Sequence, residues 1–284
     1  MTRLAVMATW DPTGEVGPHI RYQVDALLAA YDEVVVVTTT ALSPAGQAWL
    51  RERVRLIERD NSGHDFGSYR AGLAAAGPLE RFEAVTLCND SFIGPLRPYR
   101  QILDQMRGRA DFWGITRSER IAPHVQSFFI TFHRPAFTSA AFTSFWDEFE
   151  PLDDRMEVIR RYEVGLSTRL HEAGLQSAAY LTETDADRAL ARRRVKWWAW
   201  HRGPLRSRKH LRRLRRQRHV AWNPSRALAD LALDDGRMPF LKLDTLRLDP
   251  YALDADRLIT LAEERYPEAK IGRASCRERV YVLV

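Results

Sequence analysis

Three polar turns carry most of the side chains that could do chemistry, and each follows a short apolar segment. The turns span residues 11–17, 61–70 and 89–95, and each combines glycine with Asp, Asn or Ser. Asp90 comes directly after a predicted buried strand, where a carboxylate could hold a divalent cation or a ribose hydroxyl. Asn89 and Ser91 could share that work, because hard cations such as Mg²⁺ take oxygen ligands and keep several waters.

The turn at 61–70 has the features of a phosphate site. Asp65 and Arg70 lie five residues apart at the start of a predicted helix. A helix N-terminus with an arginine nearby favours phosphate, through oriented N–H groups and charge. These residues could also have purely structural roles: Asp65 could cap the helix, and Asn89–Asp90 could form a turn. For each of them considered alone, the structural role is favoured. Two such turns after two strands of one sheet favour a nucleotide-diphosphate pocket.

Fewer residues in the sequence could act as a general base. His124 and Gln126 precede a predicted strand, and a lone histidine is more often structural than catalytic. Glu163 falls in a helical region that is otherwise apolar on one face. It could be a solvated helix residue, or a general base if it faces the cleft. The chain contains no Walker loop and no GxGxxG, GxSxG or HExxH motif.

The elements that must position these residues alternate between strand and helix. The early βαβ alternation predicts an α/β fold, a Rossmann-type, mostly parallel sheet with helices on both faces. Apolar or β-branched runs predict strands at 4–8, 33–38, 54–57, 84–88, 112–116 and 127–132. Helical spacing predicts helices at 19–31, 44–53, 71–76, 140–148 and 154–173.

Composition is that of a globular protein, with 284 residues, 45% hydrophobic and 28% charged. No stretch approaches the roughly 20 apolar residues that cross a bilayer, and Asp11–Pro12 interrupts any signal-peptide core. A cytoplasmic location is therefore expected. Two cysteines are too few for a disulfide framework or a cysteine-based zinc site.

The net charge of +6 is concentrated in one segment. Residues 192–219 hold thirteen Lys or Arg and no acid, interleaved with tryptophans. Such a segment suits an anionic lipid surface first, a solvated arm second and nucleic acid third. The change in composition predicts a domain of residues 1–185, which binds the ligand, and a basic helical appendage of residues 186–270. Residues 271–284 do not continue the preceding helical pattern and are expected to be a non-native tail.

Several long strings resemble the rhamnan synthesis protein F family, in order and at family-like spacing over roughly residues 3–250. They are ATWDPTGEV (8–16), NSGHDFGSYRAGL (61–73), LCNDSFIGPL (87–96), DFWGITRS (111–118), HVQSFFITF (124–132), VIRRYEVGLS (158–167) and NPSRAL…MPFLKLDTLRLDP (223–250). The resemblance implies a GT-A-like glycosyltransferase that transfers L-rhamnose from dTDP-L-rhamnose to a polyprenyl-linked cell-surface polysaccharide. The enzyme would work with inversion at the inner face of the membrane.

The resemblance also implies roles for particular residues. Asn89-Asp90-Ser91 stands where many GT-A enzymes carry a DxD motif, with Asp90 as the candidate ligand of Mg²⁺ or Mn²⁺, although it is the motif's only carboxylate. Glu163 is the first candidate for the catalytic base and Asp111 the second. Sugar or acceptor contacts are assigned to Trp113, His124 and Gln126. The nucleotide sugar is expected against Asp11, Asn61, Gly63, Asp65, Arg70, Asn89, Asp90 and Ser91.

Two rival functions stay open at this point. One is a transferase that uses another nucleotide sugar, because sugar specificity is not legible in the sequence. The other is a non-catalytic scaffold of a polysaccharide-assembly complex. Nucleotide binding would separate the scaffold from either enzyme.

Overall fold

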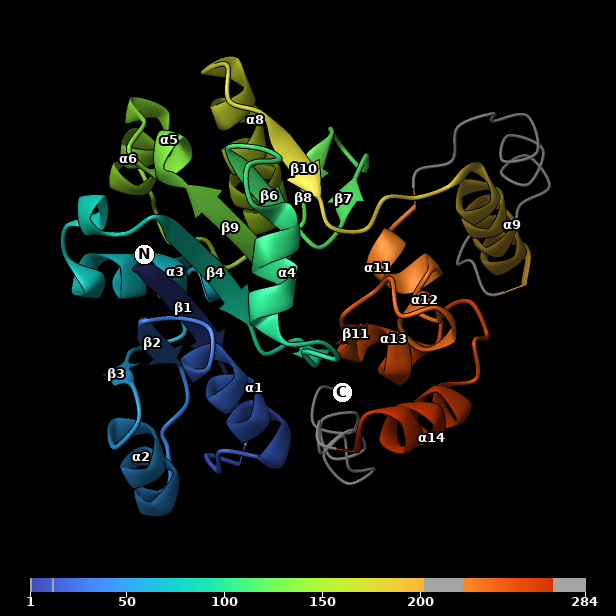
Figure 1. Ribbon diagram of the computed structural model, residues 1–284, viewed down its shortest axis with the longest axis horizontal. Helices are drawn as coiled ribbons and strands as arrows, with labels where there is room; N and C mark the ends of the chain where they lie inside the picture. The colour runs from blue at the N-terminus through green and yellow to red at the C-terminus, as the bar shows by residue number, and fades with distance from the viewer. Residues whose placement is uncertain (1, 12, 202–221, 268–284) are drawn as a thin grey trace.

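A seven-stranded sheet forms the centre of the molecule (Figure 1), in a computed structural model that describes residues 2–11, 13–201 and 222–267. The strand order is β10-β6-β9-β4-β1-β2-β3. All neighbours pair in parallel except β9, which is antiparallel to both β4 and β6. The strands are β1 Arg3–Thr9, β2 Glu33–Thr38, β3 Arg55–Glu58, β4 Ala84–Asn89, β6 Phe112–Gly114, β9 Phe129–His133 and β10 Ser177–Ala179.

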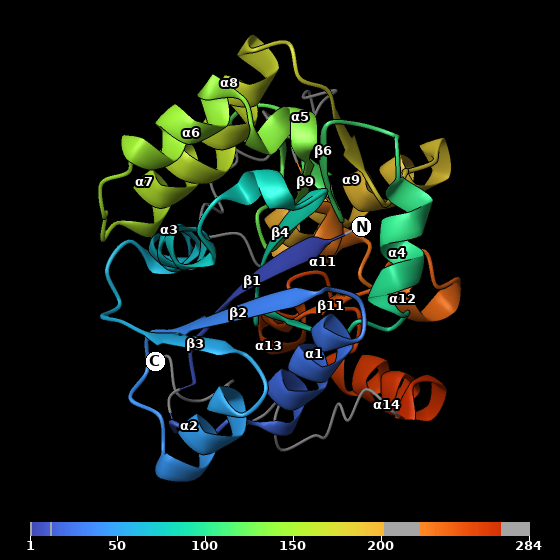
Figure 2. The same ribbon diagram turned by 60° about the vertical axis from the view of Figure 1, so that its left-hand side comes forward.

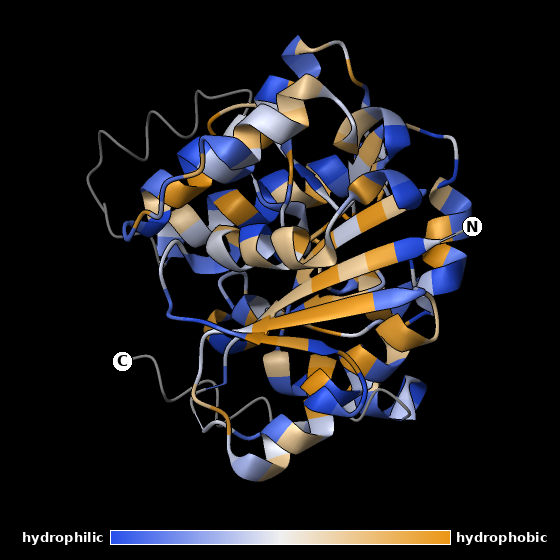
Figure 3. Cartoon of the chain, turned by 90° about the vertical axis from the view of Figure 1, so that its left-hand side faces the viewer, coloured by the Kyte–Doolittle hydropathy of each residue, from blue (hydrophilic) through white to orange (hydrophobic). Residues whose placement is uncertain are grey.

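The sheet is apolar on both faces, so it separates two hydrophobic cores (Figure 3). Along β1, Ala5 and Met7 belong to one core, while Leu4 and Val6 belong to the other. Successive side chains of a strand point to opposite faces, and continuous apolar runs are typical of a parallel strand covered on both sides. The valine-rich β2 alternates in the same way.

Helices cover both faces, which makes the molecule a three-layer α/β structure (Figure 2). One core contains α1 Pro18–Leu28 and α4 Tyr99–Met106. The opposite core contains α3 His64–Ala76, α6 Ala140–Asp147 and a composite helical stretch. That stretch consists of α7 Arg155–Val158, a π-helical turn η2 Ile159–Val164 and α8 Gly165–Glu172. Shorter connecting elements are α2 Pro44–Arg51, η1 Leu79–Arg81, β7 Arg117–Ser118, β8 His124–Val125 and α5 Arg134–Phe137.

The C-terminal region packs into the same core as α1 and α4. Its strand β11, Leu241–Lys242, pairs antiparallel with β5, Phe92–Ile93, just after the turn that ends β4. The buried Phe240 ring lies 4.2 Å from the Phe92 ring, centroid to centroid. The remaining elements of this region are α9 Asp185–His201, α11 Pro224–Ala227, α12 Leu231–Asp234, α13 Leu243–Leu248 and α14 Ala255–Arg265. The residues predicted as an appendage therefore contribute to the main core, and the domain division at residue 185 stays a prediction.

The predicted α/β architecture, a mostly parallel sheet with helices on both faces, is confirmed, with strands and helices close to the predicted ranges. One boundary is wrong: α3 begins at His64 rather than at residue 71, so Asp65 lies in its first turn. Most of the basic segment and all of the tail at 271–284 lie outside the described residues. Within the described ranges, no helix is both long enough and apolar enough to cross a membrane.

Helix α3 approaches the sheet closely at Gly72, and this packing fixes the position of Asp65, which lies about two helical turns earlier. A Cβ at Gly72 would lie 2.2 Å from Val6 Cγ1 in the neighbouring strand. We expect Gly72→Ala to reduce the free energy of unfolding by about 1–3 kcal/mol, because overpacking a core forces atoms apart. Urea unfolding followed by circular dichroism measures this. The matched control is Gly165→Ala, where the new Cβ meets only Arg160 O at 3.6 Å. An equal loss in both variants would contradict the packing argument.

Candidate functional site

A cavity of about 570 Å³ opens at the carboxyl ends of the parallel strands. In open α/β sheets this is the edge where ligands bind. Its walls come from the turns after β1 and β4, the first turn of α3, the segment before β9, the composite helical stretch and the C-terminal region. The polar residues that matter below are Asn61, Asp65, Asn89, Ser91, Arg120, His124, Gln126, Ser127, Arg155, Glu163, Arg226, Lys242 and Asp244.

Asp90 ties the ends of two central strands together. Its Oδ2 accepts hydrogen bonds from Thr9 Oγ1 at 2.8 Å and from the backbone N of Trp10 at 2.9 Å. Thr9 ends β1, and Asp90 follows β4, so one carboxylate oxygen fixes both turns. Asp90 is itself buried and does not line the cavity.

A directed chain of hydrogen bonds runs along the cavity wall from the C-terminal region to α3. The Lys242 ammonium donates to Ser91 Oγ, which donates to Asn89 Oδ1 at 2.5 Å. Asn89 Nδ2 then donates to Asp65 Oδ2 at 2.7 Å. Asp65 is exposed on the side that faces the cavity. The protein around its carboxyl still desolvates that group, and this raises the pKa of Asp65. The chain therefore orients four polar side chains from three segments.

Glu163 faces the cavity from the π-helical turn, held by two partners. Its Oε2 accepts from Ser127 N at 3.1 Å and from Ser127 Oγ at 2.5 Å. Its Oε1 lies 3.3 Å from His124 Nε2. The extra residue of a π-turn shifts the direction of side chains, and such turns are frequent at functional sites. Three groups so placed fix the carboxylate, while 18% of the Glu163 side chain stays accessible.

The charge state of this pair follows from its hydrogen bonds. His124 Nδ1 lies 2.8 Å from Ala122 O, and a carbonyl can only accept, so Nδ1 carries a proton. Burial alone would lower the pKa of His124, but Glu163 and the Ala122 carbonyl outweigh it and the pKa is raised. Burial alone would raise the pKa of Glu163, but His124 and Ser127 outweigh it and the pKa is lowered. The pair therefore favours an imidazolium beside a carboxylate.

The C-terminal region contributes charges that the sequence reasoning did not assign. Asp244 pairs with Arg226 and lies 3.9 Å from Arg155. Desolvation would raise the pKa of Asp244, yet Arg226 and Lys242 lower it overall. Desolvation lowers the pKa of Lys242 to about 8. In the sequence, the segment 223–250 shows a family resemblance but no pattern that predicts a role in the site. Nothing in its local pattern shows that it folds back onto the turn after β4.

The residues around the turn at 89–91 do not fit a divalent cation. Asp90 Oδ2 is already engaged and Asp90 is not on the cavity wall. Asn89 Oδ1 accepts from both the N and the Oγ of Ser91. In the part of the chain that the structure describes, no group of three or more His, Cys, Asp or Glu is placed to hold a metal ion. The Mg²⁺ or Mn²⁺ expected at Asp90 thus has no assembled ligand set.

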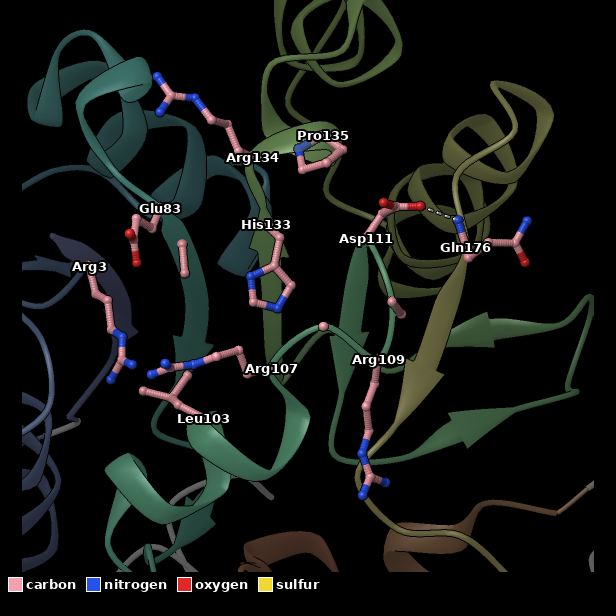
Figure 4. A pocket seen from close by; sticks show the side chains of 13 residues that line it. Arg3, Glu83, Leu103, Arg107, Arg109, Asp111, His133, Arg134, Pro135 and Gln176 are labelled. Atoms are coloured by element: carbon pink, nitrogen blue, oxygen red, sulfur yellow. Dashed lines mark hydrogen bonds between the residues drawn. The ribbon is translucent and has the colours of Figure 1, made fainter. Parts of the chain in front are cut away.

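Asp111, the second candidate base, lies at the other end of the sheet. It precedes β6, whose carboxyl end points to the main cavity. Figure 4 shows Asp111 in a separate pocket of about 670 Å³ with Arg3, His133 and Gln176. Its Oδ2 accepts from Gln176 N at 2.8 Å. The sequence could not reveal this, because a residue before a strand lies at the ligand-binding edge only if that strand runs antiparallel to the others, and strand direction is not legible in the sequence.

Two other candidates also lie away from the cavity. Arg70 is exposed, and its guanidinium lies 5.8 Å from the Phe149 ring centroid. Five residues along an α-helix is a rotation of about 140°, so Arg70 turns away from the cavity that Asp65 faces. Trp113 is fully buried in the core, with its ring 6.0 Å from that of Phe129.

The remaining candidates divide between lining and shaping the cavity. Asn61 and Gln126 line it, and Gln126 Oε1 accepts from Thr116 Oγ1 at 2.7 Å. Asp11 is buried, and its Oδ1 accepts from the N and Oγ1 of Thr13. Gly63 has a φ of 75° and caps α3, a conformation that favours glycine. A Cβ added to Gly63 would lie 2.9 Å from Phe149 Cζ, so the turn needs a residue without a side chain.

The family model for rhamnan synthesis protein F matches residues 34–199. That match covers more than half of the chain. The protein therefore belongs to the rhamnan synthesis protein F family.

Individual relatives are more distant. Over 125 residues the chain is 33% identical to the virulence protein VirA of Vibrio anguillarum, covering 42% of this chain and 40% of VirA. Over 178 residues it is 27% identical to the uncharacterized protein y4gN of Sinorhizobium fredii, covering 60% of this chain and 46% of y4gN. The match thus spans less than half the length of these relatives.

Among solved structures, one match is described as a nucleotide-diphospho-sugar transferase from Desulfovibrio desulfuricans. It aligns with a TM-score of 0.40 at 10% identity, covering 63% of this chain and 80% of that one. A likeness of this size says nothing about substrate or mechanism.

The His124–Glu163 pair makes stability depend on pH. Glu163 stabilises the fold above its ordinary pKa of 4.5, and this contribution is lost as pH falls through its lowered folded value. His124 stabilises below its ordinary pKa of 6.5, and this is lost as pH rises through its raised folded value. We expect Glu163→Gln to cost about 1–3 kcal/mol between pH 4.5 and 6.5 and less at pH 9.

Urea titrations of both proteins across this range measure the difference. The exposed Glu157→Gln, from the same helical stretch, is the control and should show no such window. A Glu163→Gln penalty independent of pH would mean that the two residues do not titrate as a pair.

Proposed function

We propose that this protein is an inverting glycosyltransferase that moves L-rhamnose from dTDP-L-rhamnose to a lipid-linked cell-surface polysaccharide. One observation supports this most strongly. In a member of the rhamnan synthesis protein F family, a single cavity at the ligand-binding edge of the sheet holds a fixed carboxylate, Glu163, and several cations. A glycosyl transfer needs both, because the acceptor loses a proton while the donor's leaving group gains negative charge.

In the proposed reaction Glu163 takes the proton from the acceptor hydroxyl. The acceptor oxygen attacks the anomeric carbon, the bond from that carbon to the diphosphate oxygen breaks, and its electron pair leaves with the nucleoside diphosphate. Transfer from a β-linked donor to an α-linked product inverts the anomeric centre, which needs one base and no covalent intermediate. The hydrogen bonds from Ser127 orient Glu163, and its lowered pKa keeps it ionised, which is the state that a base needs.

The donor is assigned to the wall that carries Asn61, Asp65, Asn89 and Ser91, and the sugar or acceptor to the wall with His124 and Gln126. The lipid-linked acceptor gives a reason for the basic segment 192–219, which would rest on the anionic inner face of the membrane. Helix α9 carries the described start of that segment, including the half-exposed Trp200.

Donor choice is tested by turnover. We expect the protein to release dTDP from dTDP-L-rhamnose in the presence of a polyprenyl-diphosphate-linked acceptor, and to turn over dTDP-glucose, UDP-glucose and GDP-mannose at least tenfold more slowly. Nucleoside diphosphate release, coupled to a colorimetric assay, measures this. Faster turnover of another donor would replace rhamnose with that sugar. Binding of donors without turnover of any would favour the scaffold function.

The base is tested by one substitution. Glu163→Gln keeps the shape of the side chain but cannot take a proton, so kcat should fall about 10²–10⁴-fold. The KM for the donor should change little, because Glu163 does not hold the nucleotide in this mechanism. The assay is run well below the unfolding temperature, with Glu157→Gln as the control. Retained kcat in Glu163→Gln would remove Glu163 as the base.

A further inference from the structure

The Lys242 ammonium is a desolvated cation that, among the described residues, makes no ion pair with a carboxylate. It leaves β11 towards the cavity, donates to Ser91 Oγ, and lies 4.3 Å from the centroid of the Phe128 ring. Across residues 2–11, 13–201 and 222–267, no carboxylate oxygen lies within 4.0 Å of Lys242 Nζ, the longest distance that counts as an ion pair. A hydroxyl and an aromatic face are weaker compensation than a carboxylate.

Such a group costs stability. Removing an ammonium from water without pairing it is expensive, and the lowered pKa of Lys242 expresses that cost. An apolar side chain of similar length would pack against Phe128 and Ser91 at lower cost. An unpaired, desolvated charge that faces a cavity is typical of a functional site, because a ligand of opposite charge supplies the missing partner.

The other cations of the cavity are differently placed. Arg226 is already paired with Asp244, and Arg155 approaches the same carboxylate at 3.9 Å. Arg120 is exposed on the loop between β7 and β8. Lys242 is the cation that contacts the turn after β4, since it holds Ser91 directly. That turn is where the sequence suggested a divalent cation and where the described part of the chain assembles no ligand set for one.

We propose that the Lys242 side chain binds the diphosphate of the donor and neutralises the leaving group, in the role that a divalent metal ion would otherwise have. This inference rests on the proposed function for the identity of the donor. As the bond between the sugar and the diphosphate breaks, the electron pair stays on the diphosphate oxygen, and the Nζ–H groups stabilise that charge by charge-assisted hydrogen bonds. Ser91 keeps the ammonium aimed at the cavity.

Binding of dTDP, thymidine and inorganic pyrophosphate to the full chain, by isothermal titration calorimetry with EDTA and with Mg²⁺, tests the proposal. We expect Lys242→Met to weaken dTDP and pyrophosphate at least tenfold and to leave thymidine unchanged. Lys242→Arg should keep most of the affinity. EDTA should not weaken binding to the unaltered protein. The matched control is Lys196→Met, an exposed lysine of α9 outside the cavity.

The outcomes separate this inference from the proposed function. Equal dTDP affinity in Lys242→Met and the unaltered protein, or loss of dTDP binding in EDTA, overturns the role of Lys242 while the transferase stands. Pyrophosphate binding that depends on Lys242, without binding of dTDP, supports the anion site and overturns dTDP-L-rhamnose as the donor. No binding of any phosphate overturns both.

Discussion

The Asp90 carboxylate holds the arrangement on which the site depends. Parallel pairing places the ends of β1 and β4 side by side, but it does not fix the turns that follow them. Asp90 does so by accepting from Thr9 and Trp10 across that junction. Since this carboxylate is committed to the backbone and a buried hydroxyl, its neighbours Asn89 and Ser91 are the members of the turn that line the cavity.

From that turn the order extends to both sides of the cavity. Asn89 reaches Asp65 at the start of α3, and Ser91 receives Lys242 from β11. The C-terminal region is positioned by its pairing with β5, two residues after Asp90, and by Phe240 in the core. A local feature, the end of one strand, thus organises segments that are about 150 residues apart in the sequence.

The sequence predicted what depends on local pattern. The apolar runs located the strands, and the position after β4 identified a turn that does line a cavity. The prediction from sequence failed where the position of a residue depends on the tertiary structure. Arg70 lies near Asp65 in sequence but turns away around the helix, and Asp111 lies at the opposite edge of the sheet. Lys242 was missed because only the long-range pairing of β11 with β5 brings it to the site.

Glu163 and Lys242 must keep opposite charges in one cavity without neutralising each other. Each is held by its own partners: Glu163 by Ser127 and His124, Lys242 by Ser91 and the Phe128 ring. The two side chains still interact electrostatically, since Glu163 is among the acids whose charge raises the pKa of Lys242. Preorganised charges of this kind need no rearrangement when a reaction separates charge. In the proposed transfer, positive charge from the acceptor proton moves to the Glu163 wall and negative charge develops at the Lys242 wall, so the fixed field favours the transition state over the bound substrates.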